Sequence, residues 1–488
     1  MYNEWISHWA RRTPGNVAVV LPGSSIRYAE FDAQIDKVAA RLAALGLAAG
    51  NRAAVLVADE YAHWLAVLAL DRIGVASASI AAVRPDNPFL AVLRPDLLVT
   101  TTEARLTAPA RSVRITREWL DETMRLPPGP RRPRRSDGAE IVRYFSSSGT
   151  TGWPKIMALT RAQVAVRIDA ERLSVGAGKE SRACVLVGPG NSGGYTWALG
   201  FWSVGGSVVL NVGPAGSIGP SLRRTMPSHL YLAVGNLVEL VRDPAAIDLQ
   251  PMPSLSVLVV GSALPKALAA QARKVLSPNI ATKYGATEVA GIALGAGAVL
   301  DQHDGTAAWV LPSAEVEAVD GDDRVLAPGA TGFLRIRTLG MVAEYLNEAP
   351  GERASSTLRG GWFYPGDLGS VSADGLVIVA GRASEVMNIG GDKYAPQALE
   401  ELALTCAGIR DAAAFSVPDK LGVETPWIAV VRGADHKPGE LVGKLGARWP
   451  QLGGIRVAVM AEIPRNQMGK IDRQTLRQQG EAAAAAER

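Results

Sequence analysis

SSSGTTGWPK, at residues 146–155, is the most informative stretch of this 488-residue chain. Glycine lets backbone N–H groups approach phosphate oxygens closely, and a dense set of hydroxyl groups with one lysine adds donors and positive charge. Pro154 before the lysine and Ile156 after it exclude a Walker-type phosphate loop. The stretch predicts a phosphate site, and a flexible loop rich in Ser, Thr and Gly is the alternative. The residues assigned to it are Ser147, Ser148, Gly149, Thr150, Thr151, Gly152 and Lys155.

Strand-like and helix-like segments alternate on both sides of this stretch, which is typical of an α/β fold. Residues 53–57 and 255–260 predict short buried strands, and residues 61–74 predict a helix with an apolar face. From about residue 305 to 340 alternating strands with Asp-Gly and Pro-Gly turns, at 314–319 and 333–338, indicate a β-rich subdomain. We therefore predict layered α/β sheets in an N-terminal domain, residues 1–383.

The remainder, residues 384–488, has strand patterns of its own at 411–417 and 426–432, and helices between them. A segment of about a hundred residues is long enough for a small α+β domain. The sequence therefore predicts a second, C-terminal domain with its own core.

Composition excludes several classes of protein. The net charge is only +4, because 51 basic residues face 47 acidic ones, so we expect no nucleic-acid partner. Cys184 and Cys406 lack the spacing of metal ligands and are expected to be reduced core residues. Residues 183–222 carry no charge, but glycine and proline interrupt them, so we expect no membrane span. These features predict a cytoplasmic protein.

Four further motifs follow the Ser/Thr/Gly stretch in order: GSALP at 261–265, YGATE at 284–288, GWFYPGD at 361–367 with GR at 381–382, and PRNQMGKIDR at 464–473. The ring of Tyr284 suits adenine stacking, the Thr287 hydroxyl can bond a phosphate, and the Glu288 carboxylate suits Mg²⁺. Core packing of Tyr284 and a solvated helix-start position for Glu288 are the alternatives. The two oxygens of Asp367 can accept both hydroxyl groups of a ribose.

Together these motifs resemble, in order and spacing, those of the adenylate-forming superfamily: acyl- and aryl-CoA synthetases, nonribosomal peptide synthetase adenylation domains and firefly luciferase. The resemblance implies that Arg382 reaches the ribose and phosphate and that Lys470 is the lysine of the adenylation step, with Thr287 and Glu288 beside it. It implies ATP and Mg²⁺, with Glu288 as metal ligand, and CoA as co-substrate. The nucleotide-binding residues outside the phosphate stretch are then Gly261, Ser262, Ala263, Tyr284, Gly285, Asp367 and Arg382.

The resemblance also implies that the small domain is mobile and turns after adenylation. Ser384 takes the position of the pivot, where the family usually has Asp or Lys. Gly390 and Gly391 resemble the segment that a pantetheine thiol passes, because glycine leaves a channel without Cβ atoms. An ordinary turn is the alternative for this pair.

The acid is expected to bind beside the uncharged segment. Asn191 stands where acyl-CoA synthetases often have His and amino acid-activating domains have Asp, which argues against an α-amino acid. The density of rings indicates an aromatic or medium-sized apolar acid, although each ring alone is also compatible with core packing. The predicted acid pocket consists of Asn191, Tyr195, Trp197, Phe201, Trp202 and Tyr231.

The sequence therefore predicts an AMP-forming acid:CoA ligase whose partners are a small carboxylic acid, ATP and an acyl acceptor. Transfer of the acyl group to an amine or to a carrier-protein thiol is the alternative within the same chemistry. A nucleotide-binding homologue without catalysis and a luciferase-like oxygenase are further alternatives. Retention of Lys470, Glu288, Asp367 and Arg382 argues against the non-catalytic homologue.

Overall fold

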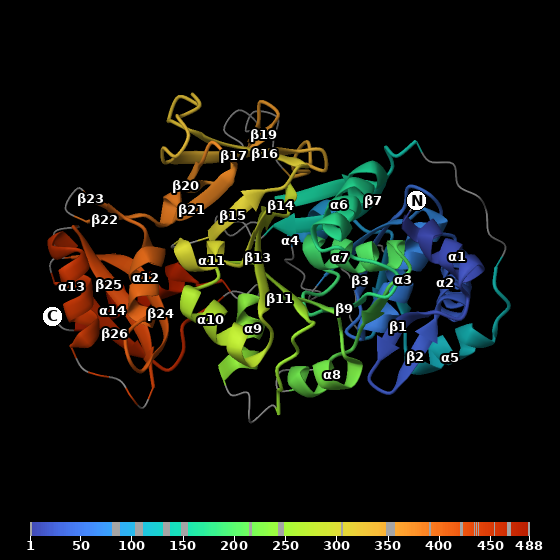
Figure 1. Cartoon of the computed structure of the whole chain (residues 1–488). Helices are drawn as coiled ribbons and strands as arrows, with labels where there is room; N and C mark the ends of the chain where they lie inside the picture. The colour runs from blue at the N-terminus through green and yellow to red at the C-terminus, as the bar shows by residue number, and fades with distance from the viewer. Residues whose placement is uncertain are drawn as a thin grey trace.

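The computed structural model is described over most of the chain. The described residues are 2–80, 88–102, 111–129, 137–147, 155–213, 217–242, 248–303, 306–347, 357–389, 392–419, 423–433, 435, 437, 439–452, 454–465 and 470–486. Figure 1 shows the N-terminal elements at one end of the molecule and the elements after residue 384 gathered at the other end. The predicted α/β fold is confirmed.

The largest sheet has fifteen strands and spans the molecule. Its order is β18-β19-β17-β20-β21-β15-β14-β13-β12-β11-β9-β10-β1-β2, with β16 paired to β17. The strands are β1 (Val17–Leu21), β2 (Ser24–Arg27), β9 (Arg182–Val185), β10 (Ser207–Val209), β11 (His229–Ala233), β12 (Ser256–Val260), β13 (Asn279–Ala286), β14 (Ala290–Ala296), β15 (Thr306–Val310), β16 (Ala314–Val319), β17 (Gly332–Thr338), β18 (Leu358–Arg359), β19 (Trp362–Phe363), β20 (Asp367–Val371) and β21 (Leu376–Arg382). The β-rich subdomain predicted from residue 305 onward forms the β15–β21 end of this sheet.

A second sheet of six strands has the order β6-β5-β3-β4-β7-β8. Its strands are β3 (Arg52–Leu56), β4 (Ala76–Ser79), β5 (Leu97–Thr100), β6 (Arg111–Arg114), β7 (Ile141–Ser147) and β8 (Lys155–Thr160). The helices of the large domain are α1 (Tyr2–Arg12), α2 (Tyr28–Ala43), α3 (Glu60–Ile73), α4 (Pro88–Leu93), α5 (Arg117–Arg125), α6 (Arg161–Ser174), α7 (Ser192–Ser203), α8 (Ile218–Thr225), α9 (Val234–Arg242), α10 (Lys266–Val275) and α11 (Val299–Gln302). In α3, Asp59 caps the first turn and Gly74, with φ 81°, ends the helix.

Helix α6 lies against α7 and β14 and carries charged residues into the core. Thr160 and Gln163 form a capping box at its start. Its buried residues are Arg161, Val164, Arg167, Ile168 and Glu171, so three charged residues lie on the buried face of the helix. Glu171 forms a buried ion pair of 2.5 Å with Lys283 of β13, and this pair ties the helix to the sheet that carries the site.

The C-terminal unit follows the short helix η2 (Ala383–Glu385). It contains β22 (Met387–Ile389), β23 (Asp392–Tyr394), α12 (Pro396–Leu404), β24 (Ile409–Pro418), β25 (Glu424–Arg432), α13 (Glu440–Arg448), the short helix η3 (Pro450–Leu452), β26 (Arg456–Met460) and α14 (Arg473–Ala486). Two hydrophobic clusters made of its own residues lie on the faces of the β24-β25-β26 sheet. A boundary at residue 384 stays our proposal.

Two other expectations concern the cysteines and membrane-spanning helices. Cys184 and Cys406 are both buried and form no disulfide. Across the part of the chain that the structure describes, every helix is too short or too polar to cross a bilayer.

Candidate active site

The carboxyl ends of neighbouring parallel strands bring three predicted segments together. Strands β9, β11, β12 and β13 pair in parallel. Helix α7 begins shortly after β9, residues 261–263 follow β12, and Tyr284 and Gly285 lie near the end of β13. Ligands of open α/β sheets bind at this edge. Gly261 has φ 95°, which glycine adopts without strain, and Ser262 is exposed there.

Thr287 and Glu288 form the tight turn between β13 and β14. The turn depends on Gly285, since a Cβ at that position would come within 2.2 Å of the Ala290 carbonyl oxygen. Glu288 is only 5% exposed, and its Oε1 accepts a hydrogen bond of 3.0 Å from the Tyr345 hydroxyl. A solvated carboxylate at the start of a helix, the alternative for Glu288, is therefore wrong.

Arg167 of α6 holds this turn from the core side. Its guanidinium donates to the carbonyl oxygens of Thr287 at 2.8 Å and Glu288 at 2.9 Å. It also donates to Gly340 O at 2.8 Å and to Ser192 Oγ, at the first residue of α7, at 3.0 Å. Burial lowers the pKa of Arg167 to about 10, against the opposing effect of the acidic Glu288 and Glu171. We did not predict Arg167 from the sequence.

Asp367 is the centre of a second group. It lies opposite Arg382 in the β20–β21 register, and its Oδ1 is 2.8 Å from Arg382 Nε. Its Oδ2 accepts a hydrogen bond from the Tyr284 hydroxyl. Burial, and then the charge of Asp367, raise the pKa of Tyr284 well above its usual value, so the phenol remains a proton donor. Three predicted nucleotide-binding residues therefore meet at one place.

Lys470 reaches both groups from the C-terminal unit. Burial, and then the positive charge of Arg382, lower the pKa of Lys470, while the charges of Asp367, Glu385 and Glu288 oppose the decrease. These side chains are close enough for their charges to act on one ammonium. Lys470, which belongs to the C-terminal unit, is therefore within electrostatic range of groups that belong to the large domain.

Two ion pairs fix the segment that carries Lys470. Arg473, at the start of α14, contacts Glu385 of η2 at 3.1 Å and Glu400 of α12 at 2.8 Å. Both partners belong to the same C-terminal unit as the lysine. Lys470 is therefore anchored to its own domain by Arg473, and it meets the large domain at its side chain.

The predicted acid-pocket rings divide into two groups along α7. Tyr231 of β11 stacks on Trp197 with centroids 4.7 Å apart, and its hydroxyl would lie 2.2 Å from a Cβ at Gly193. Tyr195, by contrast, stacks on Trp64 of α3, with 5.5 Å between the ring centroids.

Trp202 packs edge-on against the same Trp64, and its indole N–H donates to Ala18 O at 2.8 Å. Phe201 packs between Trp197 and His229. The structure thus places Trp202 in the core of the N-terminal region, away from the carboxyl edge, and does not bring all five rings together.

Asn191 caps α7. Its Oδ1 accepts hydrogen bonds from the backbone N–H groups of Gly193 at 2.8 Å and Gly194 at 3.3 Å. An amide side chain suits this role, since a short side-chain oxygen can accept from the N–H groups at a helix start. Arg161, at the start of α6, is buried in ion pairs with Asp71 and Glu140.

Some predicted residues fall outside the described part of the chain: Ser148, Gly149, Thr150, Thr151, Gly152, Gly390 and Gly391, and also the side chain of Ser147. Lys155 is described at the start of β8, where its Nζ donates to Thr357 Oγ1 at 3.2 Å. Ser384 is exposed within η2. The described residues hold no group of three metal-binding side chains. One buried carboxylate, Glu288, fits Mg²⁺, which in nucleotide sites takes one or two carboxylates together with phosphate oxygens.

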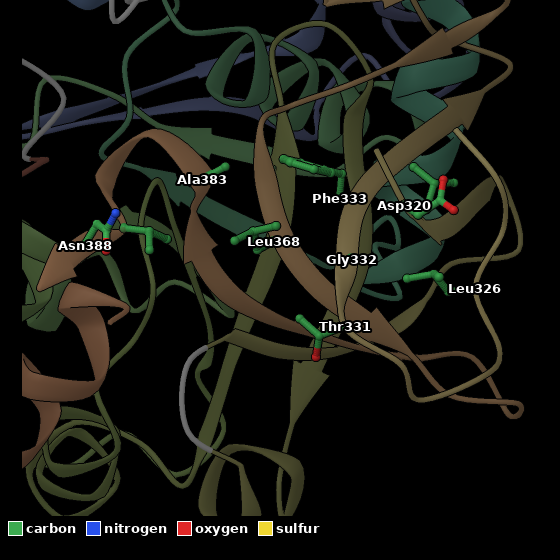
Figure 2. Close-up of a pocket in the computed structure, with 10 residues that line it drawn as sticks. Asp320, Leu326, Thr331, Gly332, Phe333, Leu368, Ala383 and Asn388 are labelled. Carbon is green, nitrogen blue, oxygen red and sulfur yellow. The ribbon is translucent and has the colours of Figure 1, made fainter. Parts of the chain in front are cut away.

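A cavity of about 460 Å³ lies at the junction of the two domains. Phe333, Leu368 and Asp320 line it from the β-rich subdomain, and Ala383 and Asn388 line it from both sides of Ser384 (Figure 2). The cavity therefore lies beside Ser384, the predicted pivot, and not at the carboxyl edge of β11–β13.

Comparison with known proteins agrees with this geometry. The family model described as AMP-binding enzyme matches residues 6–346. A 4-coumarate–CoA ligase-like protein of Oryza sativa is 33% identical over 254 residues, 49% of this chain and 45% of that protein. The fatty acid–[acyl-carrier-protein] ligase ScoC of Streptomyces coeruleorubidus is 24% identical, over 96% of this chain and 95% of that protein.

Among solved structures, a variant of the amide bond synthetase McbA from Marinactinospora thermotolerans superposes with a TM-score of 0.83. It is 25% identical, and the match covers 98% of this chain and 99% of that chain. A match of this extent includes both domains. The chain belongs to the AMP-binding enzyme family, and it is an adenylate-forming, AMP-producing acid ligase.

Proposed function

We propose that this chain joins an aromatic or medium-sized apolar carboxylic acid to ATP as an acyl-adenylate, and then transfers the acyl group to CoA. The observation that carries the proposal is the cluster of Tyr284, Asp367 and Arg382, which a hydrogen bond and an ion pair join, with the charge of Lys470 acting in the same region. Cations and a metal-binding carboxylate from two domains converge where ATP and an acid must be brought together against their mutual repulsion.

The first step requires positioning and charge neutralisation. Asp367 and Arg382 are proposed to hold the ribose, and Tyr284, Gly285 and residues 261–263 to flank the adenine. Lys470 contacts both the acid's carboxylate and the α-phosphate, and its charge offsets the negative charge that develops as pyrophosphate leaves. Thr287 donates to the α-phosphate. Mg²⁺, when bound through Glu288, supplies further positive charge to the phosphate oxygens.

The acid is proposed to lie between α7 and the end of β11. The stack of Tyr231 on Trp197 supports a flat, apolar substrate, and the Tyr231 hydroxyl fills the space beside Gly193. Trp197 and Tyr231 are 1% and 4% exposed, so they close the inner end of this space. A compact acid fits this arrangement better than a long chain directed along α7.

The second step is proposed to use the pivot at Ser384. Rotation there withdraws Lys470 and exposes Gly390 and Gly391 to a thiol arm. An amine acceptor is the second candidate, because the matched amide bond synthetase covers 98% of the chain at 25% identity. A carrier-protein thiol is the third, by similarity to the acyl-carrier-protein ligase. The buried thiols Cys184 and Cys406 support a cytoplasmic setting.

One experiment tests acid and acceptor together. Purified protein, ATP and Mg²⁺ are incubated with a panel of aromatic and aliphatic acids, each with CoA, with amines or with no acceptor. Mass spectrometry identifies the products. We expect an acyl-adenylate without acceptor and an acyl-CoA thioester with CoA. Amide with an amine but no thioester with CoA contradicts the CoA proposal, and no adenylate from any acid contradicts the acid class.

A further inference from the structure

Tyr345 lies between two charged side chains of the proposed site, Lys155 and Glu288. The Lys155 ammonium lies over the face of the Tyr345 ring, 4.5 Å from the ring centroid. The Tyr345 hydroxyl donates to Glu288 Oε1 at 3.0 Å. Tyr345 is 2% exposed, so the protein shields its ring and hydroxyl group from solvent. One side chain thus offers its electron-rich face to the cation and its O–H to the anion.

The segment around Tyr345 is bonded to the start of β8. The Leu346 N–H donates to Ile156 O at 2.8 Å, and the Ile156 N–H donates to Asn347 Oδ1 at 2.9 Å. Ile156 is the residue after Lys155 and is itself fully buried. Tyr345 therefore cannot move away from Lys155 without loss of both bonds, and its place between the two charges is built into the fold.

Thr357 completes a chain of hydrogen bonds between Lys155 and Glu288. Every donor in this chain points toward Glu288. Lys155 Nζ donates to Thr357 Oγ1 at 3.2 Å, and Thr357 Oγ1 lies 2.8 Å from the Tyr345 hydroxyl oxygen. An ammonium only donates and an ionised carboxylate only accepts. The protons must then point from Lys155 through Thr357 and Tyr345 to Glu288. Both hydroxyl groups are thereby oriented, and each charged group has a partner without contacting the other.

We propose that Tyr345 is a positioning residue that prevents a direct ion pair between Lys155 and Glu288. The inference rests on the proposed function, which assigns Lys155 to the phosphates and Glu288 to the metal. A lysine and a glutamate in contact at a poorly solvated place attract each other strongly. ATP must then break that pair before either group binds it, which lowers nucleotide affinity. With Tyr345 between them, both groups remain available.

Two substitutions separate the two parts of this role. Tyr345→Phe keeps the ring between the charges and removes only the hydroxyl group, whereas Tyr345→Leu removes both. ATP affinity is measured by titration calorimetry with and without Mg²⁺. Without Mg²⁺, we expect the Phe variant to bind ATP like wild type and the Leu variant to bind it about tenfold more weakly. With Mg²⁺, we expect a loss of about threefold for Phe and at least about tenfold for Leu.

Tyr28→Leu is the matched control, because Tyr28 is also buried but its hydroxyl bonds the carbonyl oxygens of Trp202 and Gly206. It should keep wild-type ATP affinity. Wild-type affinity of Tyr345→Leu under both conditions overturns the inference if Lys155→Ala and Glu288→Ala weaken binding. Unchanged binding in Lys155→Ala and Glu288→Ala contradicts the proposed function and, with it, the inference. If Tyr345→Leu does not fold, wild-type Mg²⁺ dependence of Tyr345→Phe overturns the inference.

Discussion

Glu288 and Lys470 meet in the same site, but the protein holds them in opposite ways. Glu288 is bound at both ends: Arg167 holds its backbone carbonyl, and Tyr345 holds its carboxylate. Lys470 is followed by Arg473, whose two ion pairs are with residues of the C-terminal unit, and its charge is within range of charged groups of the large domain. The carboxylate of Glu288, our proposed metal ligand, is thus held by contacts within the large domain, whereas Lys470 belongs to the proposed C-terminal domain.

This difference suits two separate requirements of the proposed reaction: fixed groups for binding the nucleotide, and a movable group for the adenylation step. A nucleotide and its metal require fixed partners, because preorganised groups lose little entropy when the ligand binds. In the mechanism that we propose, the lysine acts in the adenylation step and then withdraws so that an acceptor can approach. Substitutions around Glu288 in the large domain should therefore affect ligand binding and stability. Substitution of Lys470 in the C-terminal unit should affect the rate of adenylation.

The largest effect is expected for Lys470→Ala. Loss of one preorganised charge at the developing negative charge should slow adenylate formation by about 10²-fold or more, while ATP affinity changes little. Acid-dependent pyrophosphate exchange measures the first quantity and titration calorimetry the second. Lys444→Ala, which removes an exposed lysine of α13 in the same domain, is the control and should exchange at the wild-type rate. Wild-type exchange by Lys470→Ala contradicts its assignment.

Asp367→Ala, a substitution in the large domain, should lower the affinity for ATP. It takes away the proposed acceptor of the ribose hydroxyl groups and the partner of Tyr284 and Arg382. A hydrogen bond to a charged group is worth about 1.5–3 kcal/mol, so ATP affinity should fall by about ten- to a hundredfold. Asp374→Ala, on the exposed turn before β21, is the control. Unchanged affinity for ATP shows that Asp367 is not the ribose ligand.

Arg167→Met tests whether the turn that carries Glu288 depends on the buried guanidinium of Arg167. The substitution leaves the carbonyl groups of Thr287 and Glu288 without their donor, which should lower the free energy of unfolding by about 2–4 kcal/mol. The Mg²⁺ concentration needed for half-maximal pyrophosphate exchange should also rise, by about fivefold to tenfold. Chemical denaturation and a Mg²⁺ titration measure the two effects.

Arg161→Met provides the contrast on the same helix. Arg161 is also buried, but it pairs with Asp71 and Glu140 and not with the turn. We expect a similar loss of stability without a change in Mg²⁺ requirement. If both variants shift the Mg²⁺ requirement equally, Arg167 acts through general stability and not through Glu288.

The smallest effect is a shift along the pH axis. Because burial and Arg382 lower the pKa of Lys470 from its ordinary value of 10.5, the ammonium loses its proton at a lower pH than an exposed lysine does. The kcat/KM for ATP, which reports the ligand-free protein, should therefore decline on the alkaline side below pH 10.5. In Lys470→Arg any residual activity should lack this decline, since a guanidinium stays charged. An identical decline in both proteins assigns it to another group.

Hydrophobic periodicity and glycine caps predicted the positions of strands and helices well. Residues 314–319 form β16 without any shift, and residues 61–74 form α3 with Gly74 as its cap. The order of the motifs predicted Glu288, Asp367, Arg382 and Lys470 in one site; the structure pairs Asp367 with Arg382 and leaves Lys470 within electrostatic range of the other three.

The contributions of Arg167 and Tyr345 were missed, because they arise from contacts between segments more than fifty residues apart. A signal for Arg167 was present: it and Glu171 occupy apolar positions in the repeat of α6. No comparable signal distinguishes Trp197 from Trp202. Helix α7 is buried on all sides, so its periodicity does not tell which ring faces the sheet edge and which faces the core.

The contacts of Arg473 determine how motion at the pivot is transmitted. Glu385, directly after Ser384, and Glu400 of α12 both pair with this arginine, which lies three residues beyond Lys470. The pivot, α12 and the lysine segment therefore form one stiff lever arm. A change in one backbone angle at Ser384 becomes a translation at Lys470 that increases with the length of the arm, and little of it is absorbed on the way. In the mechanism that we propose, rotation at this single exposed residue moves the Lys470 ammonium away from the phosphate.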